Sequence, residues 1–129
     1  MPALSSFEYA VVRVVPRVER EEFVNAGVLV FCRQQDFLGC RVDLSEPRLL
    51  ALWPRTDVEL VRRHLDAIPR VAAGAADGGP IARLSPRERF NWLASPRSTM
   101  IQVSAVHAGL CVDPRQSLDE LFRLHVQLP

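Results

Sequence analysis

The sequence contains no lysine: all sixteen basic residues are arginines, balanced by fifteen Asp and Glu, for a formal net charge of +1 at pH 7. A domain dedicated to nucleic acid usually carries a clear basic excess. Aromatic side chains for stacking on bases are also few near the arginines, with Phe90 and Trp92 the main ones. We therefore do not expect nucleic acid as a partner, and we expect most arginines on solvated surfaces.

Cysteine is scarce as well, and Cys32, Cys40 and Cys111 show no CxxC spacing. A small, odd number of cysteines argues against a secreted disulfide scaffold. Cys32 and Cys40 could approach each other across a hairpin, but two buried thiols are the favoured interpretation. The three histidines fall on different predicted elements without HxH or HxxxH spacing, so we predict no metal site and no cofactor.

No hydrophobic run reaches the roughly 18 residues that a membrane span requires. The first six residues have neither the basic nor the apolar region of a signal peptide. These absences predict a cytoplasmic protein that does not bind a membrane. Because the chain has 129 residues and 48% of them are hydrophobic, we expect one domain over 1–129 with a core of its own.

The chain does contain β-branched runs, interspersed with helical patterns. The runs predict five strands, at residues 8–15, 28–33, 37–43, 99–103 and 110–112. Residues 28–33 are apolar on both faces, which indicates a central strand covered on both sides. The predicted fold is α+β: an antiparallel sheet of four or five strands with helices packed on one face. A second sheet layer or a partner would cover the other.

Capping boxes predict where two helices begin, at Thr56–Glu59 and at Ser85–Glu88. In each, the hydroxyl of the first residue can accept from the amide of the last, whose carboxylate reaches back. The first of these helices is expected to stop at Pro69, and the last helix of the chain has two candidate N-caps, Asp113 and Ser117. Two further segments complete the pattern: a short helix within 45–53 and a mobile Ala/Gly-rich loop within 71–80.

Polar groups gather in residues 95–109, a segment that otherwise resembles a buried strand. As a hypothesis, Arg97, Ser98, Thr99 and His107 line one pocket, provided that a turn after the strand brings His107 back antiparallel. The guanidinium fork and hydroxyls would suit a carboxylate or a phosphate. Protonation of His107 would make such a small anionic ligand bind more tightly at pH 6 than at pH 8.

Arg13 is a fifth candidate ligand-binding residue, because it lies among apolar neighbours in the first predicted strand. The favoured interpretation is an arginine on an edge strand whose stem lies on apolar surface while its charge reaches water. The alternative is an arginine held beneath an anion pocket.

Catalysis is the least favoured use of these residues. Ser98 or Ser104 with His107 lacks the GxSxG turn that exposes a nucleophile. Hydrogen bonds from the hydroxyls and the imidazole to backbone carbonyls are the most favoured interpretation, with an anion pocket between the two. We assign no catalytic residue, and a non-enzymatic role is favoured.

Three motifs occur in a distinctive order, at residues 22–31, 89–99 and 104–110. Together they resemble an uncharacterised bacterial family, domain of unknown function 3037, over nearly the whole chain. The family commonly has a proline between the serine and histidine of the last motif, where this chain has Ala105 and Val106. The resemblance implies a small bacterial cytoplasmic protein, encoded near a kinase-like protein of the HipA type and acting as its accessory or partner.

Two functions follow as expectations. The leading one is a binding or accessory module that contacts a partner protein, such as a HipA-type kinase, through a sheet face that the helices leave open. The alternative is a small enzyme or ligand-binding protein whose pocket takes a phosphate or a carboxylate.

The central-strand assignment makes a direct prediction for Phe31. Phe31→Ala should lower the free energy of unfolding by about 3–5 kcal/mol, because it opens a cavity in the core. Thermal or urea denaturation measures the change. A variant that melts within a degree or two of the wild type would contradict the assignment.

Overall fold

The computed structural model describes residues 3–97 and 99–128. Within them the chain forms five strands, four α-helices and two single-turn helices. The strands are β1 (Ser5–Val14), β2 (Val24–Cys32), β3 (Phe37–Val42), β4 (Ile101–Val103) and β5 (His107–Cys111). The helices are α1 (Glu46–Leu52), α2 (Val58–Ala72), α3 (Pro86–Leu93) and α4 (Pro114–His125), with η1 (Val18–Arg20) and η2 (Ile81–Arg83) as the single turns.

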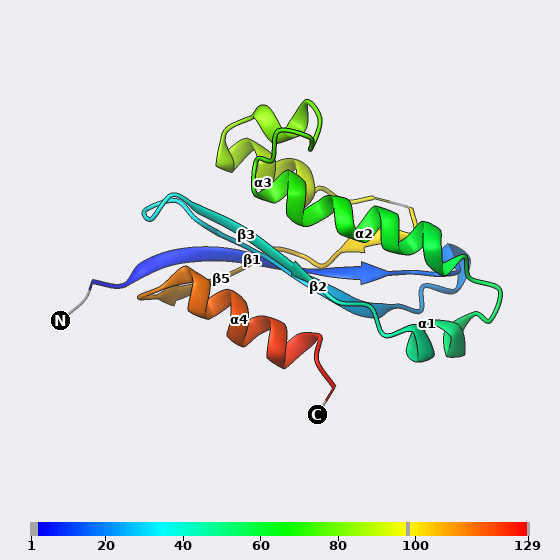
Figure 1. Cartoon of the computed structure of the whole chain (residues 1–129). Coiled ribbons are helices and arrows are strands. Elements are labelled where there is room, and N and C mark those ends of the chain that lie inside the picture. Colours follow the sequence, from blue (N-terminus) through cyan, green and yellow to red (C-terminus); the bar gives the residue numbers. More distant parts are fainter. Residues whose placement is uncertain (1–2, 98, 129) are drawn as a thin grey trace.

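The strands form one antiparallel sheet in the order β3-β2-β1-β4, and β5 pairs with β1 on the same side as β4. The α+β class and the antiparallel five-stranded sheet are therefore confirmed (Figure 1). β1 is an interior strand, with β2 along one side and β4 followed by β5 along the other.

Helices cover both faces of the sheet, so the expectation of helices on one face is wrong. Val12 and Leu29 face α2 and α3, whereas Val28 and Val30 point to the opposite face and pack against α4. Figure 1 shows α2 and α3 above the sheet and α4 below it. The prediction that β2 is covered on both faces is confirmed. The second face is covered by α4, the last amphipathic helix of this chain.

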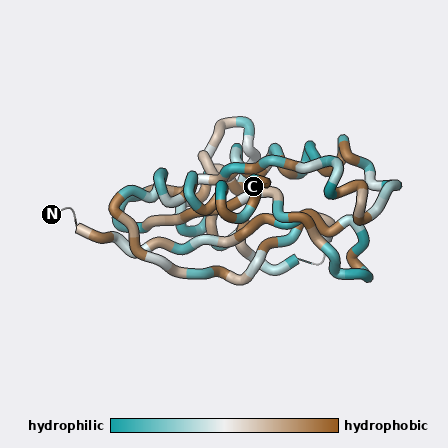
Figure 2. Tube along the Cα trace, turned by 90° about the horizontal axis from the view of Figure 1, so that it is seen from below, coloured by the Kyte–Doolittle hydropathy of each residue, from teal (hydrophilic) through white to brown (hydrophobic). Residues whose placement is uncertain are grey.

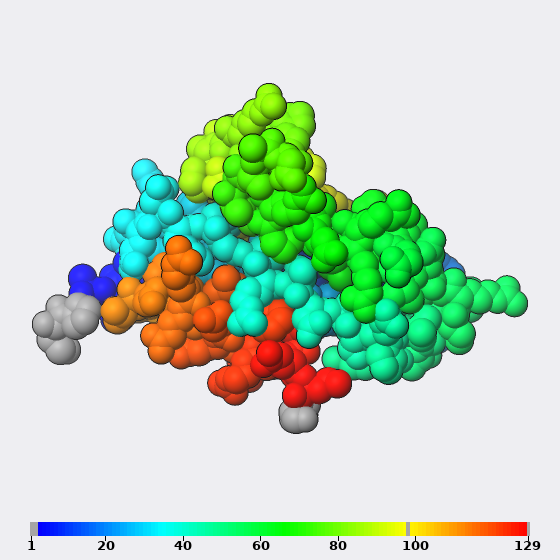
Figure 3. All heavy atoms as spheres, in the orientation of Figure 1, coloured from blue at the N-terminus to red at the C-terminus, as the bar shows by residue number. Residues whose placement is uncertain are grey.

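The larger core lies between the sheet and α2 with α3. There the Phe31 ring stacks on Phe90, with centroids 5.4 Å apart, and Phe31 is 3% exposed. The smaller core joins Phe7 on β1 to Leu118 and Phe122 on α4. Figure 2 shows hydrophobic positions along the strands and hydrophilic positions recurring on the helices. In Figure 3 the β2–β3 hairpin remains visible between the helices on either side.

The start of α2 differs from the predicted capping box. Asp57 is the N-cap, and its carboxylate accepts from the amide of Leu60 at 3.1 Å. The Thr56 hydroxyl instead donates to the carbonyl of Trp53 at 2.6 Å, within the turn that follows α1. A carboxylate one residue later in the chain thus replaces the hydroxyl at the helix N-terminus, where negative charge is favoured.

Three other helix boundaries can be compared with the predicted ones. The capping box at Ser85 is present, and Asp113 rather than Ser117 caps α4. α2 continues through Pro69 to Ala72, because burial of Val71 and Ala72 against the core outweighs the hydrogen bond that a proline cannot donate.

A bulge in β2 determines which residue lies opposite Arg13 near the end of β1. Val12 pairs with Gly27 and Arg13 with Asn25, so one extra β2 residue is inserted between these pairs. Gly27 fits because a Cβ there would lie 2.8 Å from the Arg41 carbonyl oxygen. Asn25 donates to the carbonyl of His125 at 3.2 Å, which places Asn25 and its partner Arg13 on the α4 side of the sheet.

Candidate functional site

β4 and β5 are two parts of one bulged strand. Both run antiparallel to β1, with Val12 opposite Val103 and Tyr9 opposite His107. Ser104 holds the irregular link between them: its amide donates to the Val11 carbonyl at 2.8 Å, and its hydroxyl accepts from the Val11 amide at 2.8 Å. The side chain thus satisfies a buried amide at the irregularity, and the strand continues instead of turning back.

This continuation separates His107 from Arg97. His107 lies exposed on β5, with its ring 5.3 Å from that of Tyr9. Its β1 partner is five positions away from Val14, the partner of Ile101, which corresponds to about 17 Å along a strand. The hypothesis of one pocket containing both His107 and Arg97 is therefore wrong, and tighter anion binding at pH 6 loses its basis.

The two residues after Arg97 provide less support for an anion site. Ser98 lies outside the described residues. Thr99 is exposed, and its hydroxyl donates to the carbonyl of Ile101 at 3.0 Å, while its own carbonyl accepts from the Gln102 side chain at 2.8 Å. Both contacts order the entry into β4, and the first agrees with the structural interpretation of the Thr99 hydroxyl.

Arg97 lies between two hollows at the end of the sheet. Its guanidinium stacks on Trp92 at 4.4 Å from the ring centroid, and Nη2 donates to the Trp92 carbonyl at 2.7 Å. On one side is an apolar cavity of about 430 Å³, with His64 and Met100 among its walls. On the other is a polar cleft of about 340 Å³ that Arg97 shares with Arg13.

Arg13 is not the edge-strand arginine of the favoured interpretation, since β1 is interior. Its guanidinium lies over the Phe23 ring, 4.1 Å from the centroid, and its Nε is buried without a hydrogen-bond partner. Gln102, its cross-strand partner, lines the same cleft. Of the five predicted residues, the structure thus brings Arg97 together with Arg13 in this cleft and with Thr99 in the apolar cavity. The sequence interpretation missed Gln102 and Phe23, although strand alternation could have found Gln102 had the partner strand been known.

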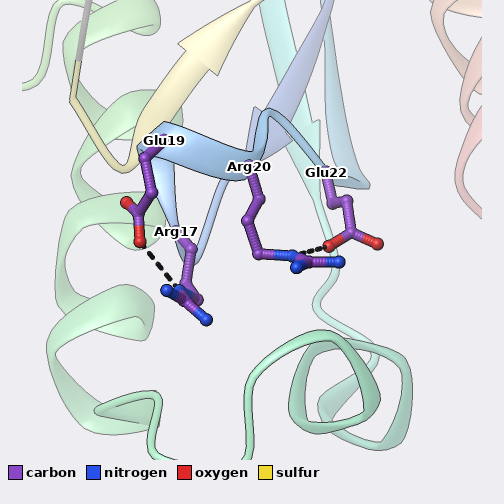
Figure 4. Close-up of polar contacts among 4 residues, drawn as sticks. All are labelled: Arg17, Glu19, Arg20 and Glu22. Carbon is purple, nitrogen blue, oxygen red and sulfur yellow. Dashed lines mark hydrogen bonds and ion pairs between the residues drawn. The ribbon is translucent and has the colours of Figure 1, made fainter.

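The turn between β1 and β2 supplies one acid to this cleft. Glu21 lines it and has a left-handed backbone, with φ of 60°. Its neighbours are engaged within the turn: Glu19 binds Arg17 and Glu22 binds Arg20 (Figure 4). A hydrogen bond from the backbone, together with Arg17, lowers the pKa of Glu19. The described part of the cleft therefore holds two arginines against one carboxylate.

Two of the three thiols, Cys40 and Cys111, have raised pKa values, which makes them poor nucleophiles. Burial raises the pKa of Cys40 to about 12, and burial together with the neighbouring Cys32 raises the pKa of Cys111. Cys32 and Cys40 face opposite sides of the sheet, so they do not meet across the hairpin. Within residues 3–97 and 99–128, no three His, Cys, Asp or Glu side chains are grouped to hold a metal ion.

The outer side of β4 and β5 is an open edge of the sheet. From Met100 to Val112 the chain has no Asp, Glu, Lys, Arg or Pro. Leu110 is 67% exposed there, and Val106 and Val112 are also exposed. Charged residues and prolines normally protect such an edge from pairing with another chain, so this edge lacks the usual protection apart from its bulge.

These features define a small α+β domain with an open, uncharged sheet edge and a separate two-arginine cleft. The chain belongs to the family described as "Protein of unknown function (DUF3037)", which it matches over residues 9–126. No curated protein and no solved structure matches it. In the described part of the chain, every helix is too short or too polar to cross a bilayer.

The bulge makes a prediction for Ser104. Ser104→Ala should lower the free energy of unfolding by about 1–3 kcal/mol, because it leaves the buried Val11 amide without its side-chain acceptor. Ser95→Ala is the matched control, since that hydroxyl donates to the Asn91 carbonyl in an exposed bond and its loss should cost about 0.5 kcal/mol or less. Equal losses in urea denaturation would contradict the role given to Ser104.

Proposed function

We propose that this protein is a binding module that recognises an extended segment of a partner protein by adding it as a strand to the β4–β5 edge. The open, uncharged edge with Leu110 exposed is the observation that carries the proposal. In strand addition, backbone hydrogen bonds provide affinity, and pockets for alternate side chains provide specificity. An edge without charge or proline suits this mode of recognition.

The opposite edge of the sheet is less suited to it. β3 contacts both α2 and α4, so helices flank it on either side. It also carries Arg41, which binds Asp119 on α4 at 2.9 Å and lies over the Phe122 ring. A charged side chain held across the strand disfavours pairing with another chain.

The surroundings of β5 indicate what the added segment would contain. Leu110 and Ala108 point to the α3 side, because they pair with Ser6 and Glu8 of β1. Ala108 also borders a hollow of about 720 Å³ that includes Arg33. A partner segment with an apolar residue over Leu110 and an acidic residue near Arg33 would fit this surface.

The class of partner is proposed from what the resemblance of the sequence implies. That resemblance implies a HipA-type, kinase-like protein, for which this module would be an accessory subunit in the bacterial cytoplasm. Such a role needs no catalytic residue in this chain. The Arg13–Arg97 cleft supports a ligand-binding role in addition, beside β4 and away from Leu110 on β5.

Leu110→Lys tests the proposal. In size-exclusion chromatography with a HipA-type kinase from the same genome, the wild type should co-elute. The variant should bind about tenfold more weakly or worse, because pairing would bury an unpaired charge. Leu124→Lys is the matched control, since Leu124 on α4 is 68% exposed against 67% for Leu110.

Both variants should melt close to the wild type, because the replaced side chains lie in solvent. The proposal fails if the wild type elutes apart from the kinase, or if Leu110→Lys co-elutes as well as Leu124→Lys does.

A further inference from the structure

We propose that Arg13 and Arg97 form a binding site for a small oxyanion, a phosphate or a dicarboxylate, in the cleft beside the β1–β2 turn. This site lies away from Leu110, the residue on which the proposed strand addition rests. Arg13 lies seven positions along β1 from Ser6, the partner of Leu110, which corresponds to about 24 Å along a strand. A ligand in the cleft would therefore not contact the β5 end of the edge.

Both guanidinium groups are held in place before any ligand arrives. Arg13 stacks on Phe23 at 4.1 Å and Arg97 on Trp92 at 4.4 Å, measured to the ring centroids. Arg97 uses one Nη2 donor for the Trp92 carbonyl. Because a guanidinium has five N–H donors, others remain for a ligand. Fixed planes with free donors match the two-pronged geometry of carboxylate and phosphate oxygens, and little side-chain entropy remains to be lost on binding.

The charge of Arg13 is not compensated by the described chain. None of the ion pairs or hydrogen bonds among the described residues includes Arg13, and Arg97 has no acidic partner there. Arg13 Nε is also buried without an acceptor. Burying part of a charged group without a partner is unfavourable. An anion over the guanidinium groups would offset that cost.

Glu21 opposes such an anion. Glu21 lines the cleft and is exposed, and no ion pair of Glu21 is found among the described residues. Like charges in one cleft repel, so Glu21 should weaken the binding of any anion. The proposal therefore predicts a variant with higher affinity as well as variants with lower affinity. Glu21→Gln should bind an anion more tightly than the wild type does.

The size of the cleft limits the ligand. A volume of about 340 Å³ suits a small molecule. Two guanidinium groups provide two separate sets of donors, which favours an anion with at least two charged oxygens. Phosphate and a dicarboxylate such as succinate share this chemistry, and only titration with each can distinguish them.

Isothermal titration calorimetry at low ionic strength tests the site, with inorganic phosphate and succinate as separate probes and chloride as the reference. The wild type should bind at least one of the two. Arg13→Gln and Arg97→Gln should each raise Kd about tenfold or more, because each removes charge-assisted hydrogen bonds. Glu21→Gln should lower Kd.

Arg63→Gln is the charge-matched control, because Arg63 is exposed on α2 and no ion pair or side-chain hydrogen bond is recorded for it among the described residues. It should leave Kd within about twofold, since distant surface charges are screened. Leu110→Lys should leave anion binding unchanged while it weakens the kinase complex, so the two proposals fail separately. If Arg13→Gln does not fold, the Kd values of Arg97→Gln and Glu21→Gln test the site.

Three results would overturn the proposal: no binding of either probe to the wild type, unchanged Kd in Arg97→Gln, or an equal loss in Arg63→Gln. The last would show attraction to the overall charge and not to a site.

Discussion

The bond from the Val11 amide to the Ser104 hydroxyl is the interaction on which the arrangement of this molecule depends. At an irregularity in a sheet, one buried amide loses its ladder partner, and an unpaired buried amide is costly. Ser104 supplies the missing acceptor at 2.8 Å and is itself 7% exposed. Because the bond is made, the chain passes the irregularity and pairs with β1 a second time as β5.

That second pairing gives the sheet its functional geometry. β5 carries His107 and Leu110 towards the start of β1, where an uncharged edge is left open. β4 stays at the other end of β1, where Gln102 lies opposite Arg13 and beside Arg97. One strand thus connects a surface suited to a partner protein with a cleft suited to a small anion, and Leu110 and the cleft lie towards its two opposite ends.

Features set by neighbouring residues were predicted from the sequence, whereas features set by long-range contacts were not. The capping box at Ser85 and the two apolar faces of β2 each depend on residues that are close together in the sequence, and both were predicted. The path after Val103 depends instead on Ser104 meeting Val11, 93 residues earlier, which no local pattern reveals. The segment was therefore predicted as a turn, and His107 was wrongly placed near Arg97. Arg13 and Arg97 were selected for their charge, but their shared cleft follows from strand order.

The position of His107 tests the account most directly, and cross-strand nuclear Overhauser effects measure it. The account predicts contacts between the backbone protons of His107 and those of Tyr9, with Gly109 likewise next to Phe7. It also predicts slow exchange of the Val11 amide with solvent. Contacts between His107 and Gln102, as a hairpin after β4 would give, would contradict it.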